Sequence, residues 1–299
     1  MTRYGPVPNF PIKDKVVCIT GGGSGIGFAL AKLCHDNGAR VLIGDLKLTS
    51  EAEEYISAQS NNDKATGVTW TKCDVKEWKD LHNLISKSLE VFGDVPDVYC
   101  PVAGVYEPPW SNFWDDREEN GYQSIRINLG HPVKLTRLAI RALAGAKKQG
   151  VVCLVASTAG IRGNYFATIY ATTKHAIMGF AKSMGQADPE EGVKVVCVMP
   201  GTVQSPLWEN REDDIAKETK YSERKLMPPS TIAEVMLRMI QEQRYSGGTC
   251  LLKTIGEERV VEQGWDAKEG EYDPSPRPEA DMSRIKAILE GERGKKWEP

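Results

Sequence analysis

Short apolar runs alternate with helical stretches along most of the chain. The apolar runs lie at 15–20, 39–45, 67–73, 97–103, 150–157, 193–199 and 249–254. The first helical stretch places Ile26, Ala29, Leu30 and Leu33 on one face, at i, i+3, i+4 and i+7. Strands that alternate with helices form a parallel sheet that is covered on both faces. The pattern therefore predicts an α/β protein with a doubly wound sheet of about seven strands.

The same pattern predicts one domain, over residues 12–263, after an N-terminal extension of residues 1–11. Two insertions, at about 105–123 and 204–229, carry aromatic and charged residues and are expected to form loops near strand ends. Residues 264–299 form a charged, proline-bearing tail in which a short amphipathic helix is predicted before Gly291. This helix is expected to dock on its own domain or on a partner subunit.

The glycine-rich segment Thr20–Gly27 follows the first predicted strand and opens the first predicted helix. This arrangement binds pyrophosphate, because glycines let the backbone approach and the free N–H groups of the helix attract anions. The second apolar run ends in Asp45, close to 20 residues later, where a carboxylate grips a ribose diol and repels a 2′-phosphate. Ser24 and Leu46 are uncharged, and Lys47 is interpreted as a solvated charge. The sequence therefore predicts NAD as the cofactor.

Tyr170 and Lys174 are one helical turn apart, and Ser157 stands thirteen residues before the tyrosine at the end of an apolar run. A free tyrosine has a pKa near 10, so only about one phenol in a thousand is ionised at neutral pH. A neighbouring ammonium lowers that pKa. The trio predicts general acid/base chemistry at a carbinol or carbonyl, in which Ser157 holds the substrate oxygen and Tyr170 exchanges its proton.

With these blocks the chain resembles the short-chain dehydrogenase/reductase family over about residues 12–262, and Pro200–Pro206 is a third matching block. The resemblance implies a Rossmann-type fold. It also implies that Asn128 completes a catalytic tetrad by holding a water that relays protons through Lys174. Asp74 would accept a hydrogen bond from the adenine amino group. The cofactor contacts predicted in this way are Gly21, Gly23, Ser24, Gly25, Ile26, Gly27, Asp45, Leu46, Asp74, Val75, Ala103, Gly104, Tyr170, Lys174, Pro200, Gly201, Val203 and Ser205.

Within the family, the segments Tyr170–Phe180 and Pro228–Thr254 look most like the 15-hydroxyprostaglandin dehydrogenases, which implies NAD-dependent oxidation of a secondary alcohol on an apolar molecule. The family commonly forms dimers or tetramers through helices that correspond here to about 120–147 and 166–187, so a homodimer or homotetramer is expected. Pro101-Val102 stands where the family usually has two asparagines. Because proline lacks a backbone donor and valine lacks an amide, the hydrogen bonds at that strand end must be replaced or lost.

The aromatic residues of the two insertions are candidates for an apolar substrate pocket with a polar rim. Trp110, Trp114 and Trp208 are the predicted substrate contacts, together with Ser157. An alternative remains open, in which these rings cover the core or form an oligomer contact.

Composition indicates a soluble enzyme. The net charge is −3, both signs are interspersed, and no basic run or long apolar stretch suits a nucleic acid or a membrane span. Met1–Phe10 lacks a signal-peptide core. The seven cysteines show no CxxC spacing and no histidine partners, so they are interpreted as reduced core thiols of a cytoplasmic protein, and no metal site is expected.

Together these patterns predict an NAD-dependent oxidoreductase that interconverts a secondary alcohol and a ketone on a medium to large apolar small molecule. Two other classes remain open: a redox sensor that binds NAD(H), and a non-redox enzyme with a cyclase-type pocket. The joint presence of Ser157, Tyr170 and Lys174 speaks against both classes, because neither requires all three side chains.

Overall fold

One eight-stranded sheet organises the protein, and its strand order is β3-β2-β1-β4-β5-β6-β7-β8. The computed structural model describes residues 5–60, 67–207, 225–262 and 283–298. The strands are β1 (Val16–Thr20), β2 (Arg40–Asp45), β3 (Val68–Lys72), β4 (Val98–Pro101), β5 (Gly150–Val155), β6 (Val193–Pro200), β7 (Cys250–Lys253) and β8 (Glu258–Val260). All neighbours pair in parallel except β7 and β8, which are antiparallel.

The predicted doubly wound parallel sheet is confirmed. The expected count of about seven strands omits only β8, because this three-residue edge strand is exposed along its length and therefore has no apolar run.

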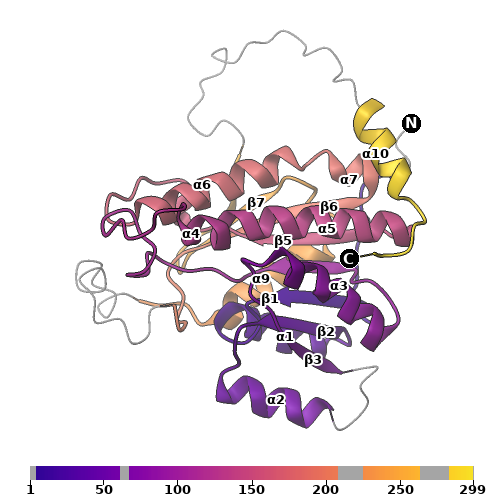
Figure 1. Cartoon of the computed structure of the whole chain (residues 1–299), viewed down its shortest axis with the longest axis horizontal. Helices are drawn as coiled ribbons and strands as arrows, with labels where there is room; N and C mark the ends of the chain where they lie inside the picture. The colour runs from indigo at the N-terminus through magenta and orange to yellow at the C-terminus, as the bar shows by residue number, and fades with distance from the viewer. Residues whose placement is uncertain (1–4, 61–66, 208–224, 263–282, 299) are drawn as a thin grey trace.

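Helices cover both faces of the sheet (Figure 1). They are α1 (Gly25–Asp36), α2 (Ser50–Ser60), α3 (Trp78–Phe92), α4 (Gln123–Ile125), α5 (His131–Ala146), α6 (Thr168–Ser183), α7 (Ala187–Glu191), α9 (Pro229–Gln241) and α10 (Ser283–Glu292), with a π-helical turn η1 (Arg126–Gly130) and a 3-10 turn η2 (Thr158–Gly160). Helices α3, α5 and α6 pack on one face, and α1 and α9 pack on the other.

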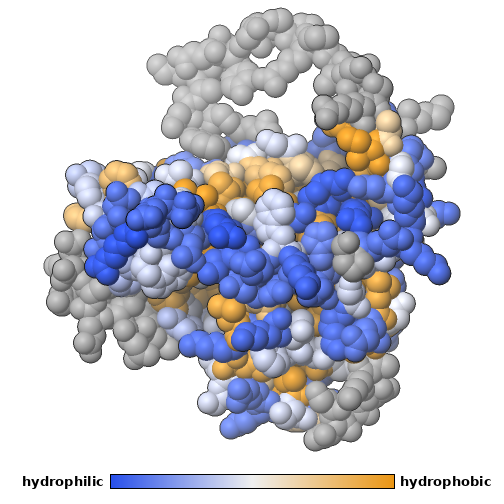
Figure 2. Space-filling view, in the orientation of Figure 1, coloured by the Kyte–Doolittle hydropathy of each residue, from blue (hydrophilic) through white to orange (hydrophobic). Residues whose placement is uncertain are grey.

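Alternate residues of each central strand enter different cores. In β1, Val16 and Cys18 pack beneath α3, α5 and α6, whereas Val17 and Ile19 pack beneath α1 and α9. Because both faces are buried, the central strands need unbroken apolar runs. All seven cysteines are free and buried, in agreement with the interpretation of core thiols. The described part of the chain contains no helix that is both long enough and apolar enough to cross a membrane. On the face drawn in Figure 2, hydrophobic residues are scattered among hydrophilic ones.

The C-terminal segment docks on its own domain. Leu289 of α10 is buried in the core cluster beneath α3, α5 and α6. Farther along, the Trp297 indole N–H donates to the Ser86 hydroxyl at 3.1 Å. A side chain at Gly145 of α5 would place its Cβ 2.5 Å from the Lys295 carbonyl oxygen, so glycine is what allows this segment to approach α5. Of the two docking sites predicted for the tail, the described residues occupy the one within the same chain.

Candidate active site

A cavity of about 1150 Å³ opens at the carboxyl ends of the strands, where parallel α/β sheets bind ligands. All the predicted cofactor contacts line it except Gly23, whose N–H instead donates to Asp45 Oδ2 at 2.9 Å. Ser157, Tyr170 and Lys174 line the cavity as well, but Asn128 does not. The sheet therefore brings together residues from loops that lie far apart in the sequence.

The glycine loop between β1 and α1 depends on the absence of side chains. Gly21 has φ +69°, and a Cβ there would lie 2.5 Å from the Ala103 backbone nitrogen. A Cβ at Gly27 would lie 2.1 Å from the Gly21 carbonyl oxygen. The first intrahelical bond of α1 runs from the Phe28 N–H to the Ser24 carbonyl at 3.0 Å, so the preceding N–H groups are free of intrahelical partners. This backbone cradle at a helix N-terminus fits a pyrophosphate.

Asp45 ends β2 at the edge of the same cavity. Its carboxylate accepts the Gly23 N–H at 2.9 Å and the Lys47 N–H at 3.4 Å, which fix its orientation. Asp74, after β3, also lines the cavity and accepts the Lys76 N–H at 3.0 Å. Lys47 is exposed, in agreement with the interpretation of a solvated charge, and it also lies in the cavity lining.

The end of β4 makes two backbone hydrogen bonds directly after Pro101. The N–H groups of Val102 and Ala103 both donate to the Thr20 carbonyl, at 3.1 and 3.0 Å. Backbone pairing with β1 therefore supplies contacts at this strand end.

Asn128 holds the backbone of the loop that follows β4. Its side-chain oxygen accepts the Val105 N–H at 2.9 Å, and its amide nitrogen donates to the Val105 carbonyl at 2.8 Å. Asn128 is buried in the π-helical turn η1, a form of helix that is frequent at functional sites. His131 lies directly after this turn and hydrogen bonds to the Thr20 hydroxyl at 2.9 Å. The structure gives Asn128 a loop-fixing role, and the water relay remains a prediction.

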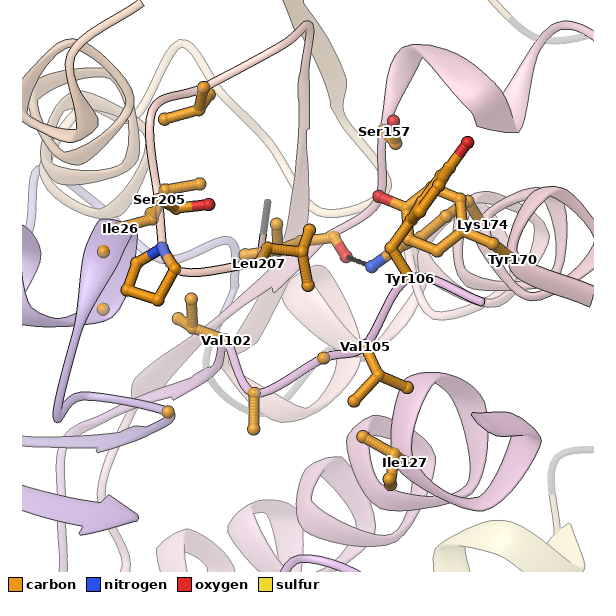
Figure 3. Close-up of a pocket in the computed structure, with 18 of the residues that line it drawn as sticks. Ile26, Val102, Val105, Tyr106, Ile127, Ser157, Tyr170, Lys174, Ser205 and Leu207 are labelled. Carbon is orange, nitrogen blue, oxygen red and sulfur yellow. Dashed lines mark hydrogen bonds between the residues drawn. The ribbon is translucent and has the colours of Figure 1, made fainter. Parts of the chain in front are cut away.

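Ser157, Tyr170 and Lys174 gather on one side of the cavity, opposite Ile26 and Ser205 (Figure 3). Ser157 follows β5, and its hydroxyl oxygen accepts the Ala159 N–H at 3.1 Å. Lys174 Nζ donates to the Val155 carbonyl at 2.9 Å and lies 5.3 Å from the centroid of the Tyr170 ring.

Burial is the largest cause of the pKa shifts of Tyr170 and Lys174. It raises the pKa of Tyr170 to about 12, although a side-chain hydrogen bond with Ser157 opposes the rise. Burial also lowers the pKa of Lys174 to about 8. The prediction that Lys174 brings the tyrosine pKa below its ordinary value is therefore wrong for this arrangement. The largest cause is desolvation of the phenolate, and the Lys174 ammonium donates its hydrogen bond to the Val155 carbonyl.

The aromatic residues of the 105–123 insertion divide into two groups. Trp110 lines the cavity, whereas Phe113 and Trp114 are absent from its lining. The ring of Trp114 packs at a tilt against Tyr165, with centroids 4.7 Å apart and an angle of 59° between the ring planes. The exposed fractions of Trp110, Phe113 and Trp114 are 46%, 46% and 50%, so none of the three rings is part of the buried core. The ring of Trp114 lies against the loop before α6 and outside the cavity lining, which speaks against the substrate contact predicted for it. Trp208 lies outside the described residues.

Two residues lie next to Tyr170, and of these Tyr106 belongs to the insertion aromatics proposed as pocket candidates, whereas Glu107 was not anticipated from the sequence. Tyr106 lines the cavity, and its ring meets the Tyr170 ring edge to face at a centroid distance of 4.7 Å. Glu107 is buried and accepts the Tyr170 backbone N–H at 2.7 Å. Nothing in the sequence separates Glu107 from the other acidic residues of this insertion. In the ranges that the structure describes, no cluster of His, Cys, Asp or Glu is suited to a metal ion.

Comparison with known proteins adds independent information. The model of a family described as short chain dehydrogenase matches residues 15–216. L-fucose dehydrogenase from Bos taurus is 28% identical over 278 residues, which cover 88% of this chain and 95% of the relative. The NAD(+) 15-hydroxyprostaglandin dehydrogenase of Mus musculus is 25% identical over 271 residues, covering 85% and 95%.

The fold has counterparts among solved structures. The crystal structure of a short-chain dehydrogenase/reductase of the glucose/ribitol dehydrogenase type from Brucella melitensis has a TM-score of 0.65 and 25% identity. The match covers 82% of this chain and 97% of that one. An NADPH-dependent 3-quinuclidinone reductase from Rhodotorula rubra superposes with a TM-score of 0.66 at 21% identity, covering 82% and 91%.

Proposed function

Since the chain belongs to the short-chain dehydrogenase family of oxidoreductases, we propose that it is an NAD-dependent enzyme that interconverts a secondary alcohol and a ketone. One observation carries this proposal. A single cavity has the glycine loop and Asp45 among its walls, and the Ser157, Tyr170 and Lys174 side chains gather on one side of it. A dinucleotide site and an acid/base group thus share one space.

The residues around the cavity fit NAD. The N–H groups at the start of α1 would hold the pyrophosphate, and the fixed Asp45 carboxylate would accept hydrogen bonds from the adenosine ribose. Asp74 would lie at the adenine, and Val203 and Ser205 at the carboxamide of the nicotinamide. When bound, NAD supplies the acceptor for the hydride that leaves the carbinol carbon. The relative named for NAD(+) supports this choice over NADP.

The protein's own residues would manage the proton. Ser157 is oriented by the Ala159 N–H and would hold the substrate oxygen. With a pKa raised to about 12, Tyr170 is a phenol at neutral pH, the form that donates a proton to a ketone oxygen. In the oxidation direction Tyr170 must first give its own proton to solvent, and the resulting phenolate then takes the hydroxyl proton of the substrate. Lys174, still mostly protonated at pH 7 with a pKa of about 8, would stabilise the negative charge that develops on Tyr170.

The cavity beside this group favours a medium to large apolar substrate. Tyr106, Pro108, Pro109, Trp110 and Leu207 line it. Such rings and aliphatic groups bind apolar surface, while Ser157 and Tyr170 fix the reacting oxygen. A redox sensor or a cyclase-type enzyme would not need this acid/base group beside the dinucleotide cradle.

A homodimer or homotetramer remains our proposal for the assembly, as does a cytoplasmic location. The outer side of α5 is partly occupied by the C-terminal segment, which limits the surface available to a second copy. Arg137 pairs there with Glu292, and Arg141 lies 4.6 Å from the Trp297 ring centroid. Because the chain's own C-terminal segment covers this stripe of α5, a second copy would have to use another surface of α5 or α6.

The proposal is tested with purified protein and NAD against a panel of secondary alcohols, by following NADH absorbance. We expect turnover of apolar alcohols. Tyr170→Phe should abolish turnover and keep NADH binding, because only the hydroxyl that exchanges the proton is lost. Tyr106→Phe is the matched control, since it removes a cavity hydroxyl and keeps Tyr170. Substantial activity in Tyr170→Phe would show that the acid/base group lies elsewhere.

A further inference from the structure

We infer that Glu107 is a positioning residue that fixes Tyr170 for the proton transfer. The inference rests on the function proposed above and deepens it. Glu107 Oε1 accepts the backbone N–H of Tyr170 at 2.7 Å, across 63 residues of sequence. The hydrogen bond is made to the backbone of the residue that we assign as the acid/base group.

Helix α6 has no capping side chain at its N-cap residue, Ala167. Its first intrahelical bond joins the Ala171 N–H to the Ala167 carbonyl at 2.9 Å. The N–H of Tyr170 precedes that bond, so it needs a partner from outside the helix. Glu107 is that partner. A carboxylate at this position also interacts favourably with the helix dipole. The helix that carries both Tyr170 and Lys174 is therefore capped by the 105–123 insertion.

The geometry of Glu107 itself indicates a built contact. The residue is only 1% exposed, and its backbone has φ +34°, which is unfavourable for a residue with a side chain. Such strain persists only where the surroundings determine the conformation, and it concentrates at functional sites. Tyr106, immediately before it, packs its ring on the Tyr170 ring at a centroid distance of 4.7 Å. Two consecutive residues thus hold the backbone and the ring of Tyr170.

The consequence for catalysis is geometric. Without the Glu107 oxygen, the Tyr170 N–H loses its partner and the first turn of α6 is free to relax. The phenol would then move relative to Ser157, which holds the substrate oxygen. A misplacement of about 1 Å costs on the order of a hundredfold in rate. The pocket-forming insertion and the acid/base residue therefore act as one unit.

Three variants test this inference in the full-length protein. Glu107→Ala removes the acceptor, and Glu107→Gln keeps an oxygen in the same place. Glu118→Ala is the matched control, because the Glu118 carboxylate accepts the Gln123 N–H at 3.0 Å in the same insertion, whereas the Glu107 carboxylate accepts the N–H of Tyr170 itself. The first readout is amide hydrogen exchange at Tyr170. The second is kcat and KM with an alcohol from the panel that the wild type oxidises.

In Glu107→Ala we expect Tyr170 amide exchange to speed up at least about tenfold and kcat to fall about 10- to 100-fold, with KM changing less than about threefold. Glu107→Gln should restore kcat to within about threefold of wild type, and Glu118→Ala should leave both readouts unchanged. Unchanged exchange in Glu107→Ala, or faster exchange with normal kcat, would overturn the inference. If the wild type oxidises no alcohol, the proposed function fails separately, and the exchange experiment alone decides whether Glu107 fixes Tyr170.

Discussion

The choice between NAD and NADP is predicted to depend on the charge of Asp45. This carboxylate is half-buried at the cavity edge, and the Gly23 N–H holds it at 2.9 Å. Asp45→Asn removes the charge but keeps an oxygen that can accept from Gly23. Asp45→Ala would also leave the Gly23 N–H without its acceptor and would weaken the binding of both cofactors. Asparagine is therefore the substitution that isolates electrostatics.

The size of the effect follows from two contributions. Two unit charges about 4 Å apart in water repel by about 1 kcal/mol, so a 2′-phosphate of nearly two charges loses about 2 kcal/mol against Asp45. A charged hydrogen bond to the ribose hydroxyl adds about 1.5 kcal/mol in favour of NAD. Lys47, in the same lining, offsets part of the repulsion. The wild type should therefore prefer NAD by about a hundredfold, and Asp45→Asn by about tenfold or less.

Calorimetric titration of wild type and Asp45→Asn with NADH and NADPH measures this preference directly. The Asp45→Asn protein should gain affinity for NADPH more than it loses affinity for NADH. Raising the ionic strength should weaken the discrimination in the wild type and have less effect in the variant, because salt screens the charge. An unchanged hundredfold preference in Asp45→Asn, or equal affinities in the wild type, would refute the role given to this carboxylate.

Three further predictions concern the pocket, the buried lysine and the C-terminal segment. Trp110→Ala should lower kcat/KM about 5- to 150-fold with little change in Tm, because this ring lines the cavity and is 46% exposed. Trp114→Ala, the control, should leave kcat/KM within about twofold of wild type. Equal losses of kcat/KM in the two variants would place Trp114 in the site. Burial lowers the pKa of Lys174 from 10.5 to about 8, so between these pH values the unfolded chain binds a proton that the folded protein has released. The unfolding free energy of wild type, measured in urea, should therefore rise by up to about 3 kcal/mol relative to Lys174→Met between pH 8 and 10.5. A difference that stays flat or falls with pH would contradict this sign. Trp297→Ala should lower the unfolding free energy by about 2–4 kcal/mol and leave kcat/KM unchanged, because the ring packs between α3 and α5, away from the cavity. Trp78→Ala is the control, since Trp78 is exposed. A loss below about 1 kcal/mol in Trp297→Ala would mean that the C-terminal segment is only loosely docked.

The hydrogen bond between Glu107 and the Tyr170 N–H could not be predicted from the sequence, because it depends on packing between distant segments. Among the acidic residues of its insertion, only Glu107 is buried and bonded to α6, and this follows from how the loop after β4 folds over the helix. The separation of Trp110 from Trp114 has the same origin. Both are tryptophans in one short insertion, and only the path of the loop sends one into the cavity and the other against Tyr165.

The pKa values of Tyr170 and Lys174 also could not be predicted from the sequence. Spacing alone indicated that Lys174 lies one turn from Tyr170, and this is correct. The sign of the tyrosine shift depends instead on how far burial desolvates the phenolate and on where the ammonium makes its hydrogen bond. These quantities are properties of the packed site, so a spacing of four residues cannot supply them.

The sequence by itself determined the doubly wound sheet, the glycine cradle and the residues that meet at the carboxyl ends of the strands. It could do so because these features follow from local periodicity, from glycine's conformational freedom, and from the rule that parallel strands end on one edge. Tertiary structure alone decided which loop residues enter the cavity, which carboxylate caps α6, how the C-terminal segment covers α5, and how burial shifts the pKa of Tyr170 and Lys174. Each of these depends on contacts between segments far apart in the chain, whose energies no local pattern encodes.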